Sequence, residues 1–109
     1  MNTDLKNKKC KPCTGNIIKF NEKQIIDNLS NINNWSVNEE QKMIFKKFSF
    51  KTFKQALDFT NKVGKIADEE GHHPDVSLGF GYALIMLHTH AIQGLSINDF
   101  ILASKIDLL

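Results

Sequence analysis

Arginine is absent from this 109-residue chain, so lysine supplies all fourteen of its permanent side-chain positive charges. Without a guanidinium group, no side chain can grip a phosphate or a guanine through two parallel hydrogen bonds, which counts against sequence-specific contact with DNA. Long hydrophobic runs are absent too. The longest, Tyr82 to Leu87, falls far short of the roughly 20 apolar residues that a membrane-spanning helix needs. We therefore expect neither a nucleic-acid partner nor a membrane-spanning segment.

Cysteine is scarce, and both copies belong to one Cys-x-x-Cys motif at Cys10 and Cys13. A zinc site would need a second pair of Cys or His residues at related spacing nearby, and a redox motif would follow a buried strand and open a helix. Neither context is present, so we interpret the motif as a reduced pair in a flexible segment. No apolar stretch typical of a secretory signal follows Met1, and we expect a cytoplasmic protein.

The positive charge is concentrated near the N-terminus. Residues 1–19 hold five Lys and one Asp, whereas residues 20–109 hold nine Lys and eleven acidic residues. Hydrophobic residues make up 41% of the chain, which is ordinary for a globular protein, and 109 residues are too few to bury two separate cores. The sequence thus predicts a Lys-rich N-terminal arm over 1–19 and a single folded domain over 20–109.

Hydrophobic spacing within that domain predicts seven elements in the order α-β-β-α-β-β-α. This order is typical of an α+β fold in which a four-stranded antiparallel sheet has helices packed on one face. Both faces of the last strand are apolar, which favours helices on one face and a subunit partner near the other. The expected helices cover 20–32, 53–70 and 97 onward, and the expected strands cover 35–37, 43–50, 75–80 and 83–90.

The predicted helix ends carry clear local signals. Gly71 is well placed to end the second helix. The three residues before it, Asp68, Glu69 and Glu70, are all acidic, although the helix dipole disfavours anions at a C-terminus by about 0.3–1 kcal/mol each. Either solvent screens these charges, or one carboxylate is there for a purpose. Three pairs with capping-box spacing mark the helix starts: Asn21–Gln24, Thr52–Gln55 and Ser96–Asp99.

All four histidines of the chain fall within residues 72–90. His72 and His73 follow the helix end, and the proline after them pushes His73 toward extended geometry, so that the two imidazoles diverge. His88 and His90 would project from the same face of the last strand. Such a group could act as general acid and general base, could bind zinc with Asp75 as an extra ligand, or could consist of unrelated surface histidines. Composition and spacing leave these three possibilities open.

The histidines belong to a larger spaced set, namely Asp68, His72-His73-Pro74, Phe80, Thr89-His90, Gly94-Leu95-Ser96 and Asp99. In order and spacing this set resembles the signature of the pterin-4a-carbinolamine dehydratase family. The resemblance covers nearly the whole chain, since it continues upstream through the helix Phe53–Ala67, the Phe-x-Phe at Phe48 and Phe50, Trp35 and the opening from Lys9-Cys10 to Gly15.

The resemblance implies a four-stranded antiparallel sheet with helices on one face, assembled as a homodimer or homotetramer. It also implies a hydro-lyase that converts 4a-hydroxytetrahydrobiopterin to quinonoid dihydrobiopterin and water, in tetrahydrobiopterin recycling, without a metal or other cofactor. By the same resemblance, the catalytic acid–base residues are His72, His73 and His90. Asp68 and Asp99 also match family positions, and we expect both to bind the pterin substrate. Asp68, one helical turn before His72, could instead hold an imidazole, and Asp99 also suits the capping box.

Several positions depart from the family pattern. Val76 and Phe80 stand where members often have Trp and Tyr, and Asn98 stands where some have Arg. His88 lies outside the signature, so we interpret it as a surface or interface residue. Some family members also act as dimerisation cofactors for a transcription factor through a helical surface. An interaction module of that kind is therefore the alternative to the enzyme.

Overall fold

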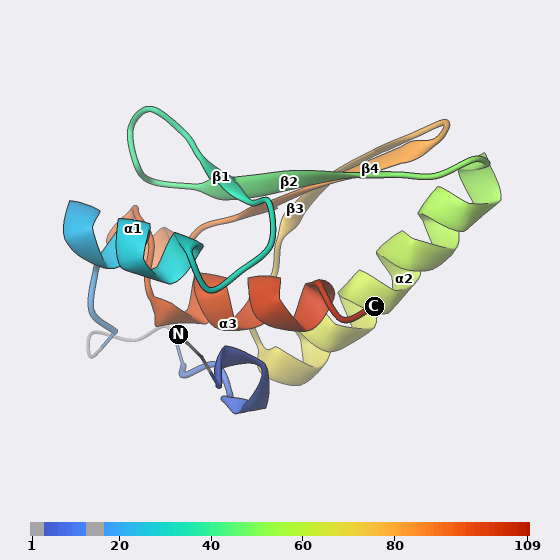
Figure 1. Cartoon of the computed structure of the whole chain (residues 1–109). Coiled ribbons are helices and arrows are strands. Elements are labelled where there is room, and N and C mark those ends of the chain that lie inside the picture. The colour runs from blue at the N-terminus through green and yellow to red at the C-terminus, as the bar shows by residue number, and fades with distance from the viewer. Residues whose placement is uncertain (1–3, 13–16) are drawn as a thin grey trace.

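The structure, a computed structural model, describes residues 4–12 and 17–109. Three α-helices and four β-strands follow one another in the predicted order, which is confirmed (Figure 1). None of the described helices is long and apolar enough to cross a membrane. The elements are η1 (Leu5–Asn7), α1 (Glu22–Leu29), β1 (Ser36–Val37), β2 (Ile44–Ser49), α2 (Phe53–Glu70), β3 (Asp75–Gly79), β4 (Tyr82–Leu87), η2 (His90–Ile92) and α3 (Ile97–Ile106), where η denotes a 3-10 turn.

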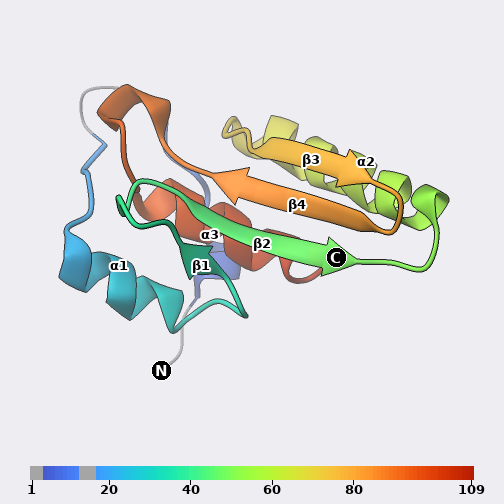
Figure 2. The same ribbon diagram turned by 90° about the horizontal axis from the view of Figure 1, so that it is seen from above.

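The four strands form one antiparallel sheet in the order β1-β2-β4-β3. All three α-helices lie on the same face of this sheet, with α2 toward the β3 edge, α1 toward the β1 edge and α3 between them (Figures 1 and 2). The predicted α+β class is therefore confirmed. The other face carries half-buried apolar side chains, including Phe45, which pairs with Met86 across the sheet. A subunit over this face stays a prediction.

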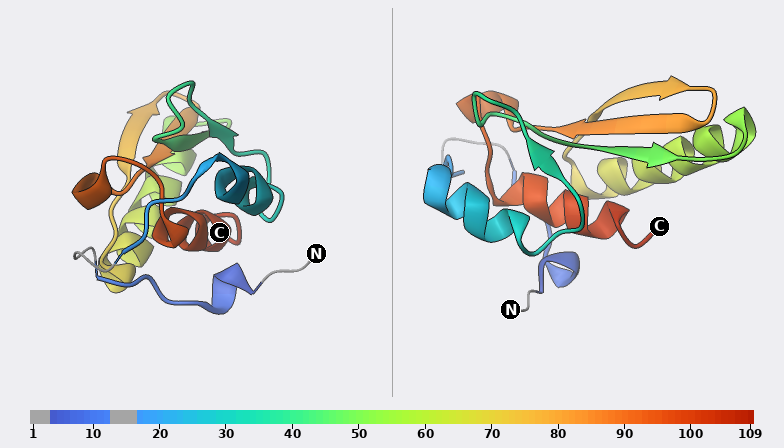
Figure 3. Two further views of the ribbon diagram at one scale, coloured as in Figure 1. Left: turned by 90° about the vertical axis from the view of Figure 1, so that its left-hand side faces the viewer. Right: turned by 45° about the horizontal axis from the view of Figure 1, so that its top comes forward.

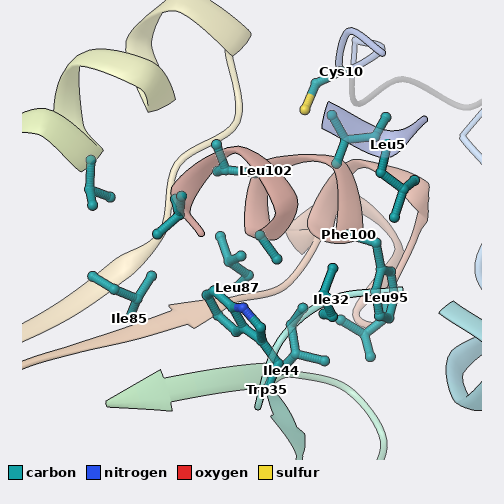
Figure 4. Packing of buried hydrophobic residues seen from close by; sticks show 14 of the residues in the cluster. Leu5, Cys10, Ile32, Trp35, Ile44, Ile85, Leu87, Leu95, Phe100 and Leu102 are labelled. Carbon is teal, nitrogen blue, oxygen red and sulfur yellow. The ribbon is translucent and has the colours of Figure 1, made fainter. Parts of the chain in front are cut away.

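Alternate residues of β4 form part of the hydrophobic core on the side of the sheet. Ala83, Ile85 and Leu87 face the helix layer and are fully buried. Figure 4 shows Phe100 and Leu102 of α3 in the same cluster as Ile85 and Leu87. Burying each of these larger side chains stabilises the fold by about 1.5–3 kcal/mol. The core thereby fixes α3 against the sheet, and with it the start of α3 near Ser96.

The prediction of a strand over 83–90 is wrong at its C-terminal end, because β4 stops at Leu87. Thr89 instead forms an isolated bridge with Gly94, and His90 begins the turn η2. The turn is closed by Gln93, which has a left-handed φ of 50° without being glycine. His90 therefore lies in a chain reversal beyond the sheet, and the pleat of a strand does not orient its side chain.

The described part of the Lys-rich arm, residues 4–12, packs against α3. Leu5 and Cys10 are buried in the core cluster, and η1 lies on the side of α3 away from the sheet (Figure 3). The prediction of a flexible segment is wrong for residues 4–12, because the buried side chains of Leu5 and Cys10 anchor them. Cys13 lies outside the described residues, so the predicted reduced pair stays a prediction.

Candidate active site

The end of α2 delivers two of the predicted residues to one place. Gly71 follows the helix with a φ of 67°, a left-handed conformation that glycine adopts without the strain of a Cβ atom. The N–H of His72 then donates to the Ala67 carbonyl at 3.2 Å. The predicted stop at Gly71 is confirmed. It places His72 and His73 between the end of α2 and the start of β3.

His72 is buried and paired with a buried carboxylate. Its side chain is 4% exposed, and its Nε2 lies 2.6 Å from Oδ1 of Asp99, whose side chain is 0% exposed. Oδ2 of Asp99 accepts hydrogen bonds from the Thr89 hydroxyl and the Ser96 N–H. An ionised carboxylate can only accept hydrogen bonds, so an ionised Asp99 requires the form of His72 that carries a proton on Nε2. The predicted Ser96–Asp99 capping box is confirmed, and its carboxylate also holds an imidazole.

His73 has a carboxylate partner of its own, on the surface. Its Nε2 lies 2.9 Å from Oδ1 of Asp68, and the two side chains are 61% and 82% exposed. A pair so exposed contributes little to folding stability. It can still hold the imidazole in one orientation. Asp68 therefore contacts the imidazole of His73.

The other two histidines form a contact pair. The ring centroids of His88 and His90 are 4.1 Å apart with an interplanar angle of 62°. His88 Nε2 also lies 3.2 Å from Oδ2 of Asp75. Within residues 4–12 and 17–109, no hydrogen bond reaches the imidazole of His90. Three of the four imidazoles thus pair with a carboxylate, and the fourth packs against a paired neighbour.

All four imidazoles border one cavity of about 300 Å³. Asp68 and Asp99 do not line it, since each stands behind a histidine. A larger hollow of about 800 Å³ lies elsewhere, near the start of α2, and has no histidine in its lining. The chemistry therefore selects the smaller cavity. Its lining consists of Gly71, His72, His73, Pro74, Asp75, His88, His90 and Ala91.

His88 and Asp75 are the members of this site that the dehydratase interpretation left out. His88 lies outside the signature, yet it lines the cavity, contacts Asp75 and packs against the ring of His90. The signal in the sequence was the His-x-His spacing itself. The family signature has no histidine at this position.

The zinc alternative finds no arrangement to support it in the described part of the chain. No group of three or more His, Cys, Asp or Glu side chains there is disposed to hold a metal ion. The four imidazoles instead pair with separate carboxylates or with each other. Imidazoles placed in this way can donate and accept protons.

Comparison with known proteins assigns the chain to a family. The family model described as pterin 4 alpha carbinolamine dehydratase matches residues 18–109. The chain therefore belongs to the pterin-4a-carbinolamine dehydratase family, as the resemblance predicted.

Two relatives show how far the similarity extends. A protein of Halorhodospira halophila is 43% identical over 105 residues, covering 96% of each chain. One of Legionella pneumophila is 42% identical over 110 residues, covering 100% of this chain and 97% of its own. Both are provisionally named as pterin-4-alpha-carbinolamine dehydratases.

Two solved structures share the fold. A transcriptional coactivator/pterin dehydratase from Brucella melitensis superposes with a TM-score of 0.79 at 23% identity, over 84% of this chain and 97% of its own. A pterin dehydratase-like protein, identified as a RuBisCO assembly factor in the alpha-carboxysome, has a TM-score of 0.60 at 23% identity, over 70% and 88%. At this identity the likeness concerns the fold alone.

Proposed function

We propose that the protein converts 4a-hydroxytetrahydrobiopterin to quinonoid dihydrobiopterin and water, in tetrahydrobiopterin recycling. Membership of the family supports this reaction class. The observation that carries the proposal is that His72, His73 and His90 border one cavity of about 300 Å³. That volume is at the lower end of the range for small-molecule sites. Proton transfers suffice for the reaction, so the proposal includes no cofactor.

The proposed mechanism needs one acid and one base. An imidazolium donates a proton to the 4a-hydroxyl, so that the C4a–O bond breaks with water as the leaving group. The N5 lone pair forms the C4a=N5 double bond, and a neutral imidazole accepts the N5 proton. A positioned acid or base contributes about 10²–10⁴-fold each. We assign the two roles within the group His72, His73 and His90.

We propose that Asp68 and Asp99 serve the reaction through the imidazoles. Asp99 lies 2.6 Å from His72, and Asp68 lies 2.9 Å from His73. A carboxylate on the far side of an imidazole fixes the orientation of the ring and the nitrogen that carries the proton. The predicted contact of either carboxylate with the pterin stays a prediction, and the complete burial of Asp99 favours the positioning role.

We also propose that the protein is a homodimer or homotetramer in the cytoplasm. The half-buried Phe45, Leu84 and Met86 on the uncovered face of the sheet support an assembly. The alternative function, an interaction module, has support from α2, where Phe53 and Leu57 are exposed. The name of the Brucella melitensis protein includes a coactivator role for that protein. Under this alternative, partner binding would survive the loss of the histidines.

An assay of synthetic 4a-hydroxytetrahydropterin tests the enzyme directly. We expect the wild-type protein to accelerate loss of water, and His72→Ala and His90→Ala each to lower the rate by about 10²-fold or more. A triple variant that also carries His73→Ala should have no activity above background. Lys23→Ala, on an exposed part of α1, serves as the control and should match the wild type. Full activity in a folded triple variant would refute the proposed function.

A further inference from the structure

The N-terminal arm, residues 4–12, is tied to residues that adjoin the site without belonging to it. Glu70 is the last residue of α2 and is separated from His72 by Gly71 alone. Asn98 directly precedes Asp99, the partner of His72. Both Glu70 and Asn98 bind the arm. The same two helix ends that hold the His72–Asp99 pair are therefore bridged a second time.

The first connection is made by the Glu70 carboxylate. Its Oε1 accepts a hydrogen bond from the Cys10 N–H at 2.8 Å, and its Oε2 lies 2.6 Å from Lys105 Nζ on α3. The Glu70 side chain is only 6% exposed. Burial alone would raise the pKa of its carboxyl, but the hydrogen bonds from Lys105 and Cys10 outweigh burial and lower that pKa. Glu70 is thus an ionised, buried link between α2, α3 and the arm.

This contact explains an oddity of the sequence. An acidic residue at a helix C-terminus opposes the helix dipole. Of the three acidic residues there, Asp68 and Glu69 are exposed, whereas Glu70 is turned into the protein and paired with Lys105. Two of the three carboxylates therefore have specific contacts: Glu70 binds Cys10 and Lys105, and Asp68 contacts His73.

The second connection is made by the amide of Asn98, which is fully buried. Its Oδ1 accepts from the Lys11 N–H at 2.8 Å, and its Nδ2 donates to the Lys11 carbonyl at 2.7 Å. The Cys10 thiol lies 3.6 Å from the Asn98 carbonyl, to which it donates. The amide pairs with the arm as a neighbouring strand would. It holds the arm across the start of α3.

We infer that Glu70 and Asn98 are positioning residues that use the N-terminal arm to fix His72 against Asp99. The His72–Asp99 contact spans from the end of α2 to the start of α3, so its 2.6 Å distance depends on the spacing of those two helix ends. The arm, Glu70 and Lys105 set that spacing independently. A displacement of about 1 Å in a catalytic group can cost on the order of 10²-fold in rate. The kinetic consequence rests on the proposed function, whereas the geometric consequence does not.

The test compares Glu70→Ala with Glu69→Ala, a matched control at the same helix end whose side chain is exposed. In the dehydratase assay, Glu70→Ala should lower kcat by roughly 10-fold or more and leave KM within about twofold. Glu70→Gln, which keeps an acceptor for the Cys10 N–H, should restore part of kcat. Asn98→Ala should resemble Glu70→Ala. Glu69→Ala should resemble the wild type in every measurement.

A second readout follows the proton on Nε2 of His72 through its direct, one-bond ¹H–¹⁵N correlation in NMR spectra. Its exchange with water should accelerate about 10-fold or more in Glu70→Ala and Asn98→Ala, because the pair with Asp99 opens more often. If these variants keep wild-type kcat and wild-type exchange, even with a lower melting temperature, the inference is wrong and the arm is only structural. If the wild type lacks dehydratase activity, the proposed function fails, and the NMR exchange alone then decides the inference.

Discussion

At the scale of single residues, the burial of a carboxylate determines how much its contact with an imidazole contributes to folding stability. The described part of the chain holds three such pairs, and they differ most in burial. The side chains of His72 and Asp99 are 4% and 0% exposed, whereas those of His73 and Asp68 are 61% and 82% exposed. Water screens the exposed pair and competes for its hydrogen bonds, so only the buried pair is tightly coupled to folding.

This contrast gives a prediction for two identical substitutions. Asp99→Asn places an amide N–H₂ group either against the Nε2–H of His72 or against the Ser96 N–H and the Thr89 hydroxyl, so at least one buried N–H loses its acceptor. We expect the free energy of unfolding to fall by about 2 kcal/mol or more. Asp68→Asn should change it by less than about 0.5 kcal/mol. Urea denaturation of both variants measures the difference, and equal losses would contradict it.

The site residues differ in how well the sequence could reveal them. His72, His73 and His90 were predicted because their spacing matches a known signature, and the structure brings all three to one cavity. His88 was set aside, although its ring lies against that of His90. The binding of Glu70 to Cys10 could not be predicted either. The two residues are 60 positions apart, and no local pattern encodes which carboxylate turns inward.

At the scale of the elements, the features encoded within a few residues were predicted best. Ser96 with Asp99 caps α3, and Gly71 ends α2, as expected. Thr52 caps α2 by accepting from Gln55, but the Gln55 side chain accepts from Lys51 instead of completing the box. The end of β4 could not be predicted, because the chain reverses at Gln93. This residue has a left-handed φ of 50°, a conformation that a sequence usually signals with glycine.

Two glycines, one inside α2 and one directly after it, should respond in opposite directions to the same change. Gly71→Ala places a Cβ on a residue with a φ of 67°, which costs about 1–2 kcal/mol of unfolding free energy. Gly64 lies inside α2, where an added Cβ would meet no atom within 4 Å. Gly64→Ala should therefore stabilise the protein by about 0.5–1 kcal/mol. Thermal unfolding of both variants checks the signs, and a shared sign would contradict this account of α2.

At the scale of the whole molecule, the arm adds a third layer beneath the helices and the sheet (Figure 3). The composition of residues 1–19 suggested a separate, flexible appendage, because lysines dominate it. That expectation is wrong for residues 4–12, because the buried side chains of Leu5 and Cys10 dock this segment on α3. The order of elements and the sheet with helices on one face were predictable from periodic patterns. The docking of the arm was not, because its partners lie 60 to 88 residues away.

The docked arm should give the folded protein a distinctive alkaline response through Cys10. Burial, with the nearby Glu70 charge second, raises the pKa of the Cys10 thiol from 9.0 to about 12. The unfolded chain therefore loses this proton first as the pH rises, so unfolding becomes easier between pH 9.0 and about 12. The slope from this one group is at most about 1.4 kcal/mol per pH unit. Below pH 9.0 the thiol is protonated in both states and contributes no pH dependence.

Urea denaturation at several pH values isolates that slope when two variants are compared. Cys13→Ser removes the other thiol, and Cys10→Ala combined with Cys13→Ser removes both. The single variant should lose unfolding free energy more steeply above pH 9.0 than the double variant, while their slopes coincide below it. Every other ionisable side chain is present in both variants, so the comparison isolates the Cys10 thiol. Parallel curves above pH 9.0 would mean that the Cys10 thiol is not buried in the folded protein, and that the arm does not dock on α3 in solution.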